Sequence, residues 1–384
     1  MPATTIPLRW DIFCTVIDNF GDIGVCWRLA RQLVAEHGFS VRLWVDDLAV
    51  FRHLCPQINP DQTQQSVQGV EIRHWAGDFS GVNPGDIVVE AFACRLPESF
   101  EAAMAERHPR PVWINLDYLS AEAWVSGCHA LPSPHPRLPL TKYFFFPGFN
   151  EKTGGLLREN DLESRRQSFA AEPAARSQLL DNMRIRPAQS GSLLVSLFSY
   201  ENPALADLLD VWSKGSRPVY CLVPSTRRHP VLEGFARRTL QVGDVVKKGQ
   251  LELHLVPFVP QTEYDPLLWL CDLNFVRGED SFVRAQWAAN PMLWQIYPQK
   301  EETHHVKLAA FLDLYCDGLT ETEAETVRTF FLAWNGEARI TQALWERWLG
   351  IFPQLQRHAC SWQKKLIKQQ DLCSCLVQFC RSKL

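Results

Sequence analysis

Two hydrophobic spacings alternate along residues 1–125. Short apolar, β-branched runs are followed by segments whose apolar residues recur at helical spacing. Runs of the first kind are typical of buried parallel strands, and those of the second predict helices packed on a sheet. Strands are expected at 10–17, 40–45, 86–90 and 112–116, and a helix at 25–36 that stops at Gly38. Strands separated by helices predict right-handed βαβ units and a parallel sheet.

The same alternation restarts beyond a polar stretch. Residues 153–187 are rich in Glu, Arg, Gln and Ala and are interpreted as a connector. After it, strands are expected at 192–198, 218–223, 251–257, 272–276 and 292–296, with helices at 203–214, 264–270 and 282–289. A chain of 384 residues suits two domains of ~150–200 residues each.

The expected fold class is α/β, with two Rossmann-like, doubly wound domains facing each other across a cleft. The domains are placed at 1–152 and 188–359. Residues 360–384 carry apolar residues at helical spacing, so one amphipathic helix is expected there, docked on the first domain. Ligands of such sheets bind beyond the carboxyl ends of the strands, which is where a phosphate-bearing ligand is expected.

Composition narrows the class of protein. Hydrophobic residues make up 46% and charged residues 21%, which is ordinary for a globular protein. A net charge of −4 argues against a protein that holds nucleic acid through many phosphates. The sequence has no apolar run long enough for a membrane span, and its first residues do not indicate a signal peptide, so neither is expected. The 12 cysteines lack the spacing of a zinc ribbon or a redox pair, so a cytoplasmic, monomeric protein with reduced thiols is expected.

The sequence DNFGDIG at 18–24 follows the first expected strand. Glycine lets the backbone approach a ligand, and a helix start offers unpaired N–H groups. Asp22 is interpreted as a functional carboxylate in preference to a helix N-cap, and both roles stay open for Asp18. The loop lacks a complete GxGxxG fingerprint, and Asp22 would repel a pyrophosphate. A nicotinamide-dependent oxidoreductase is therefore disfavoured.

The sequence RGEDS at 277–281 is a more specific signal, because it lies between an expected strand and the helix at 282–289. Backbone N–H groups at that helix start, with the Ser281 hydroxyl, are suited to a diphosphate. Glu279 is suited to ribose hydroxyls, and Asp280 or Ser281 is expected to cap the helix. Tyr297 follows the next strand and brings a phenolic hydroxyl to the same edge.

Aromatic residues complete this edge of the second sheet. Phe258 follows the strand at 251–257 and either stacks on a base or packs in the core, while the backbone at Gln261 is placed to read the base. Tyr200 follows the strand at 192–198. Together these residues predict a nucleotide pocket. The chain contains no DxD motif, so a metal–diphosphate site is not expected.

With these residues assembled, the chain resembles the EarP family, the bacterial protein-arginine rhamnosyltransferases that modify translation elongation factor P. The resemblance spans nearly the whole length. It is densest in DNFGDIGVCWRLARQL (18–33), EAFACRLPES (90–99), INLDYLSAE (114–122), PFVPQ (257–261) and VRGEDSFVRAQWAANPMLWQIYPQ (276–299).

The resemblance implies a GT-B fold, in which the first domain binds the acceptor and the second binds the nucleotide sugar. It implies inverting, metal-independent transfer of L-rhamnose from dTDP-β-L-rhamnose to an arginine of elongation factor P, with no cofactor. Asp22 would be the catalytic base and Asp18 its acidic partner. Asp117 is a candidate contact for the acceptor arginine. The implied donor-binding residues are Asn19, Phe20, Gly21, Tyr200, Phe258, Gln261, Arg277, Glu279, Asp280, Ser281 and Tyr297.

A second function remains open at this stage. A nucleotide-sugar-binding protein or a chaperone of elongation factor P would use the same pocket without turnover. Asp22 argues against this alternative, because a carboxylate beside an anionic donor does not favour simple binding.

Overall fold

A computed structural model describes residues 7–18, 20–77, 79, 81–225, 228–298 and 303–384. The chain divides into two compact units. Unit 1 comprises the chain up to Asn160 together with Lys368–Leu384, and unit 2 comprises Asp161–Ile367. Among the described residues, no helix is long and apolar enough to cross a membrane.

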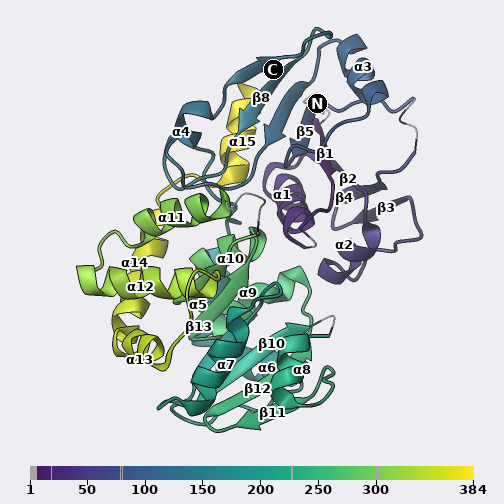
Figure 1. Ribbon diagram of the computed structural model, residues 1–384. Coiled ribbons are helices and arrows are strands. Elements are labelled where there is room, and N and C mark those ends of the chain that lie inside the picture. The colour runs from purple at the N-terminus through teal and green to yellow at the C-terminus, as the bar shows by residue number, and fades with distance from the viewer. Residues whose placement is uncertain (1–6, 19, 78, 80, 226–227, 299–302) are drawn as a thin grey trace. The chain divides into compact units, whose positions relative to one another are not determined.

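Unit 1 is a sheet with helices along it (Figure 1). Its strands are β1 Arg9–Cys14, β2 Ser40–Val45, β3 Gln64–Val67, β4 Val70–His74, β5 Ile87–Ala91, β6 Val112–Leu116, β7 Pro132–Pro134 and β8 Thr141–Phe145. Its helices are α1 Gly21–His37, α2 Leu48–Leu54, α3 Glu98–Glu106, α4 Val125–Cys128 and α15 Leu372–Arg381.

The strand order of unit 1 is β3-β4-β2-β1-β5-β6-β8-β7. The strands from β4 to β8 pair in parallel, and only the edge strands β3 and β7 pair antiparallel. After β1, the strands β2, β4 and β3 extend the sheet on one side of β1. The later strands β5, β6, β8 and β7 extend it on the other side. The switch point of the sheet therefore lies between β1 and β5, and ligands of doubly wound sheets bind at that point.

The core of unit 1 contains large aromatic side chains from neighbouring strands. Phe13 of β1 stacks on Trp44 of β2 with ring centroids 5.6 Å apart, and Phe100 of α3 packs edge-on against Phe13. A buried ion pair fixes the same two strands, because Arg42 donates two hydrogen bonds to Asp11 at 2.6 and 2.7 Å. Every strand residue from Trp10 to Cys14 is buried, as expected for a strand covered on both faces.

Helix α15 returns the end of the chain to unit 1, beside β8 (Figure 1). Phe379 of α15 contacts Tyr143 and Phe145 of β8, at ring distances of 5.3 and 5.7 Å. The N-cap of the helix, Asp371, accepts a hydrogen bond from Gln32 of α1. Gly155 lies against the backbone of Gln370, the residue before this N-cap. It has φ of 74°, and a Cβ there would come within 2.3 Å of the Gln370 carbonyl oxygen.

We expect Gly155→Ala to destabilise the protein by about 1–3 kcal/mol more than Gly38→Ala, because both residues have positive φ but only Gly155 also lacks space. Gly38 has φ of 69°, and no neighbouring atom lies within 4 Å of the position that a Cβ would occupy, so Gly38→Ala isolates the conformational cost. Chemical unfolding of the two variants measures the difference. Equal losses would mean that the turn at Gln370 moves aside freely.

Unit 2 contains a second sheet and most of the helices. Its strands are β9 Leu193–Leu197, β10 Val219–Ser225, β11 Val245–Lys248, β12 Leu251–Pro257, β13 Leu273–Arg277 and β14 Met292–Gln295. Its helices are α5 Leu162–Ala171, α6 Pro173–Asn182, α7 Ala204–Lys214, α8 Pro230–Ala236, α9 Gln261–Leu270, α10 Asp280–Ala288, α11 Thr303–Tyr315, α12 Glu321–Trp334, α13 Gln342–Gly350 and α14 Phe352–Leu366.

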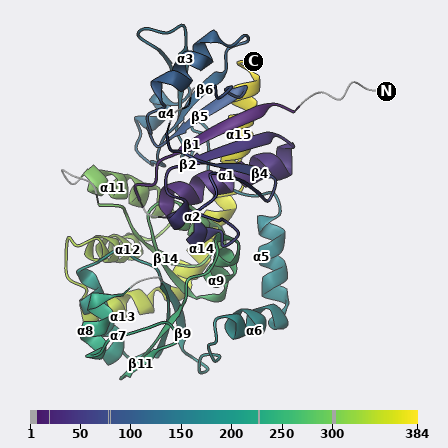
Figure 2. The ribbon, with the colours of Figure 1, turned by 90° about the vertical axis from the view of Figure 1, so that its right-hand side faces the viewer.

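The strand order of unit 2 is β11-β12-β10-β9-β13-β14. Only β11 pairs antiparallel, and the order reverses between β9 and β13. The stretch interpreted as a connector holds α5 and α6, which follow one another in Figure 2. Helix α5 packs on α9 through Phe169 and Trp269, whose rings are 5.7 Å apart.

Several sequence-based expectations are corrected by these boundaries. Helix α1 begins at Gly21 instead of residue 25, and α10 at Asp280 instead of residue 282, because glycine-containing segments read as loops supply their first turns. The single helix expected at 360–384 is also wrong. Helix α14 ends at Leu366, and Asp371 caps a separate helix, α15, which begins at Leu372.

Candidate functional site

Asp22 lies in the first turn of α1, at the carboxyl end of β1 and beside the switch point of unit 1. Its side chain is 2% exposed. One carboxylate oxygen, Oδ2, accepts the backbone N–H groups of Ile17 and Asp18, both at 2.8 Å. The less favoured alternative, in which Asp22 is the N-cap of α1, is wrong. The N-cap is Phe20, and the Asp22 side chain binds the loop before the helix. Asp22 thereby holds the loop in place while staying inside the helix.

The surroundings of Asp22 favour the neutral form of its carboxyl group. Burial raises the pKa of Asp22, while hydrogen bonds from Asp18, Ile17 and Tyr118 oppose part of that rise. The charge of Asp46 raises it further. A carboxylate with a raised pKa holds a proton more readily, which suits a group that must accept one during a reaction.

The other candidate residues of unit 1 gather around the same edge. Asp18 is buried, and its carbonyl accepts the Gly21 N–H at 2.7 Å. A Cβ at Gly21 would come within 2.4 Å of Asp18 Oδ2, so any other residue there would force the Asp18 side chain to shift. Phe20 contacts His53 edge-on with ring centroids 5.8 Å apart. Asn19 lies outside the described residues.

Asp117 follows β6 at the same sheet edge and accepts the N–H of Tyr118 at 2.8 Å. Its neighbour Tyr118 was not anticipated as a site residue, yet its hydroxyl lies 3.4 Å from Asp22 Oδ1. In the sequence, the one feature that could have indicated Tyr118 is its position next to Asp117, just after the buried strand β6. Without the fold, no rule indicates which of these two side chains turns toward Asp22.

In unit 2, the loop after β13 leads straight into α10. Gly278 has φ of 58°, a left-handed conformation that favours glycine, and its carbonyl accepts the Trp294 indole N–H at 2.7 Å. The N-cap of α10 is Glu279, which makes no side-chain capping bond, so the expected capping by Asp280 or Ser281 is wrong. Instead, Ser281 donates its hydroxyl hydrogen to the Arg277 carbonyl and accepts the Arg277 N–H. This pair of bonds closes the loop tightly onto the helix.

Arg277 brings a buried positive charge to this edge. Its guanidinium carbon lies 4.3 Å from the ring centre of Phe198 and 4.5 Å from that of Tyr200, both of which follow β9. Tyr200 in turn contacts Tyr297 edge-on at 5.5 Å, and Tyr297 is 37% exposed. The residues after β9, β13 and β14 therefore meet beside the β9–β13 switch point, as the sequence predicted for one sheet edge.

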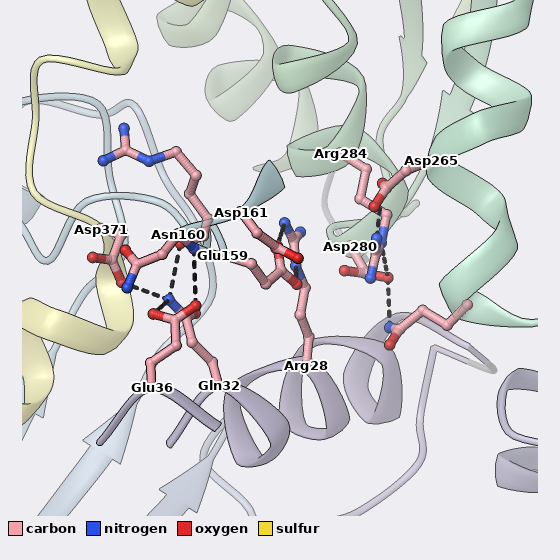
Figure 3. A network of polar contacts seen from close by, with 12 residues as sticks. Arg28, Gln32, Glu36, Glu159, Asn160, Asp161, Asp265, Asp280, Arg284 and Asp371 are labelled. Carbon is pink, nitrogen blue, oxygen red and sulfur yellow. Dashed lines mark hydrogen bonds and ion pairs between the residues drawn. The ribbon is translucent and has the colours of Figure 1, made fainter. Parts of the chain in front are cut away.

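Asp265, Asp280 and Arg284 form a buried polar network (Figure 3), which Gln261 joins through Asp280. Gln261 is the first residue of α9, and its side-chain amide donates to Asp280 Oδ2 at 2.9 Å. Arg284 donates to the same oxygen at 3.0 Å and to Asp265 at 2.8 Å. Arg284 and Asp265 were missed by the sequence analysis, although Arg284 lies four residues after Asp280, one turn along the same helix.

Phe258 follows β12 and is partly buried, with its ring 6.0 Å from that of Phe198. It therefore joins the same aromatic group as Arg277 and Tyr200. Among the described residues, no group of three or more His, Cys, Asp or Glu side chains could hold a metal ion.

Comparison with known proteins identifies the family. The family model for the elongation factor P rhamnosyltransferase EarP matches residues 10–381. The protein-arginine rhamnosyltransferase of Pseudomonas aeruginosa is 50% identical over 96% of this chain and 98% of its own length. That of Neisseria meningitidis serogroup B is 40% identical over 94% of this chain and 92% of its own length.

Solved structures agree with the family and the fold. A structure described as the basis for EarP-mediated arginine glycosylation of translation elongation factor EF-P has a TM-score of 0.72 and 37% identity, and covers 98% of this chain and 100% of its own. A glycosyltransferase from Rickettsia africae is similar in fold alone, with a TM-score of 0.51 at 10% identity over 99% of this chain and 97% of its own. The expected α/β class with a GT-B fold is confirmed. The chain belongs to the EarP family of elongation factor P rhamnosyltransferases.

Proposed function

We propose that this protein transfers L-rhamnose from dTDP-β-L-rhamnose to one arginine of elongation factor P, with inversion at the anomeric carbon and without a metal ion. Membership of the EarP family supports the sugar and the acceptor. The observation that carries the catalytic proposal is the buried Asp22 carboxylate, held by two backbone N–H groups at the switch point of unit 1. Unit 1 is assigned to the acceptor and unit 2 to the donor. We further propose that the enzyme acts as a monomer in the cytoplasm.

The acceptor sets the main chemical difficulty. An arginine guanidinium has a pKa above ~12 and stays protonated, and its delocalised nitrogens are poor nucleophiles. Asp22 cannot remove the proton in advance. We propose that it orients one N–H, localises positive charge on the far side of the guanidinium, and takes the proton as the carbon–nitrogen bond forms.

The donor must lose a diphosphate as that bond forms. Backbone N–H groups at the start of α10 and the guanidinium of Arg277 bring positive charge to the proposed diphosphate position. Their position supports stabilisation of the leaving group without a metal ion. Direct displacement by the nitrogen inverts the anomeric carbon and needs no covalent intermediate. Glu279 and Tyr297 are assigned to the ribose and to the sugar-diphosphate, respectively.

One reaction tests the whole proposal. Purified protein is incubated with dTDP-L-rhamnose and unmodified elongation factor P, and the acceptor is weighed by intact mass spectrometry. A gain of one deoxyhexose on one arginine is expected, in the presence or absence of EDTA. The anomeric configuration of the product, read by NMR, tests inversion. Donor binding without any gain would favour the alternative of a sugar-nucleotide-binding protein or chaperone.

Phe258→Ala is expected to raise the dissociation constant for dTDP roughly 5- to 150-fold, because base–aromatic stacking contributes about 1–3 kcal/mol. Isothermal titration calorimetry with dTDP measures the change. Phe235→Ala, in α8 of the same unit, is the matched control and should leave the constant unchanged. An unchanged constant in Phe258→Ala would assign Phe258 to the core instead of the base.

A further inference from the structure

The two carboxylate oxygens of Asp22 have different surroundings. Oδ2 accepts two backbone N–H groups at 2.8 Å. Oδ1 faces the hydroxyl of Tyr118 at 3.4 Å, the one hydrogen bond to this oxygen from the described part of the chain. A carboxylate oxygen that already accepts two short hydrogen bonds is poorly placed to take a proton. Oδ1 is therefore the oxygen on which a proton from the acceptor would be received.

The ring of Tyr118 is held firmly where its hydroxyl meets Asp22. It stacks on Phe92 with ring centroids 4.5 Å apart and an angle of 24° between the planes. Asp117 fixes its backbone by accepting the Tyr118 N–H. Two separate contacts therefore determine the position of the hydroxyl, one to the ring and one to the main chain.

Phe92 itself adopts an unusual backbone conformation. Phe92 and Ala93 both have positive φ, 56° and 55°, which non-glycine residues rarely adopt. The Phe92 N–H donates to the Leu116 carbonyl at 2.7 Å, which ties this turn after β5 to the end of β6. Strained backbone of this kind persists where the surrounding structure demands it, and it concentrates at functional sites. Here it places an aromatic ring under Tyr118.

We propose that Tyr118 is a positioning residue for the transfer reaction, whose hydroxyl fixes Oδ1 of Asp22 as the proton-accepting oxygen. The proposal rests on the proposed function, since it concerns the same reaction. The carbon–oxygen bond between rhamnose and the diphosphate breaks, and its electron pair leaves with dTDP. The carbon–nitrogen bond forms from the guanidinium, and one N–H proton moves to Oδ1. Tyr118 keeps its own proton and turns its hydroxyl to accept from the new carboxyl O–H.

The other charged or titratable groups around Asp22 do not replace Tyr118. Asp46 is a carboxylate whose charge opposes a negative charge on Asp22, and Asp18 acts on Asp22 through its backbone N–H. Cys14 of β1 and Cys26 of α1 are buried thiols behind it, and burial raises the pKa of Cys14 well above its ordinary value. Tyr118 is thus the neutral side-chain donor that favours ionised Asp22, and its hydrogen bond lowers the pKa of that carboxyl.

Tyr118→Phe tests the proposal, because it removes the hydroxyl and keeps the stack on Phe92. The acidic limb of the kcat profile should move to higher pH, since loss of the hydrogen bond raises the pKa of Asp22 further. On that limb kcat should fall roughly fivefold, the size expected for one hydrogen bond, and should recover toward wild type at higher pH. The KM for elongation factor P should stay unchanged. Rhamnosylation is followed by intact mass from acidic to alkaline pH.

Tyr143→Phe, in β8 of the same unit, is the matched control and should leave the profile unmoved. Thermal unfolding of both variants confirms that they are folded. An unmoved acidic limb in Tyr118→Phe, or a change in KM alone, would overturn the proposal and make Tyr118 an acceptor contact or a packing residue. Failure of the wild-type protein to transfer rhamnose at any pH would instead overturn the proposed function.

Discussion

Asp22→Asn is expected to lower the rate of rhamnosyl transfer by about 10²–10⁴-fold, the usual contribution of a general base. Asparagine has the shape of aspartate. Its side-chain carbonyl can accept the N–H groups of Ile17 and Asp18, and its amide can donate to the Tyr118 hydroxyl oxygen. The loop before α1 should therefore keep its structure, and the affinity for dTDP should not change. The loss should appear in kcat, measured by intact mass of the acceptor at saturating donor.

The same substitution should stabilise the protein at neutral pH. Burial raises the pKa of Asp22 in the folded state above its ordinary value. The folded state then binds the proton more tightly than the unfolded state, so the contribution of Asp22 is most favourable below the ordinary pKa and is lost as pH rises through the raised one. Asparagine carries no charge at any pH. The melting temperature of the Asp22→Asn protein should exceed that of wild type at neutral pH, and this difference in melting temperature should disappear at acidic pH.

Asp47→Asn is the control for both measurements. Asp47 caps α2 in the same unit, a role that asparagine fills equally well. This variant should keep full activity. A fully active Asp22→Asn protein would reduce Asp22 to a residue that only organises the loop, whereas loss of activity with loss of stability would leave the base unidentified and require the Asp22→Glu variant.

Arg284→Met is expected to destabilise unit 2 by about 3–5 kcal/mol, because it breaks a buried network and removes the buried cation that bridges two carboxylates. Arg284 is 2% exposed and bridges Asp265 and Asp280, which are 3% and 8% exposed. Methionine fills most of the same volume, so the loss reports charge and hydrogen bonding more than packing. Chemical denaturation followed by tryptophan fluorescence measures it.

Two comparisons separate charge from volume in this experiment. Arg339→Met removes an exposed arginine whose partner is Asp207, and it should change the free energy of unfolding very little, because water screens an exposed ion pair. Adding Asp265→Asn and Asp280→Asn to Arg284→Met removes the two buried carboxylate charges that Arg284 neutralised, and it should recover part of the lost stability. A loss for Arg284→Met no larger than that for Arg339→Met would show that the network contributes little to folding.

The order of the central strands along the chain, and the edge at which the site residues lie, follow from the amino-acid pattern. The segments 40–45, 112–116 and 251–257 were predicted with the boundaries that β2, β6 and β12 have. The reason is physical: strands buried on both faces are mostly apolar, and the pattern stays recognisable although single polar residues such as Arg42 and Asn115 interrupt it. Tyr200, Phe258 and the 277–281 loop lie at the carboxyl ends of β9, β12 and β13. Parallel pairing of these strands in one sheet was therefore enough to bring them to the same edge.

The edge strands and the helix starts depend on tertiary contacts. β3 reads QQSV, with one buried residue, and β7 is three residues long, so neither has a pattern that distinguishes it from a loop. The first turns of α1 and α10 contain or follow glycine, which lowers helix propensity, yet the neighbouring strands and the buried Asp22 and Ser281 bonds hold them helical.

The roles of single side chains at the site also required the fold. Sequence spacing placed Asp22 near a ligand, but its burial, and the contributions of the distant Asp46 and Tyr118 to its pKa, arise only in the folded chain. Tyr118 stands 96 positions from Asp22, and no local rule joins them. Periodicity reports which face of an element is buried, whereas the contact between two distant loops depends on sheet order, register and backbone conformation. Those are properties of the folded chain alone.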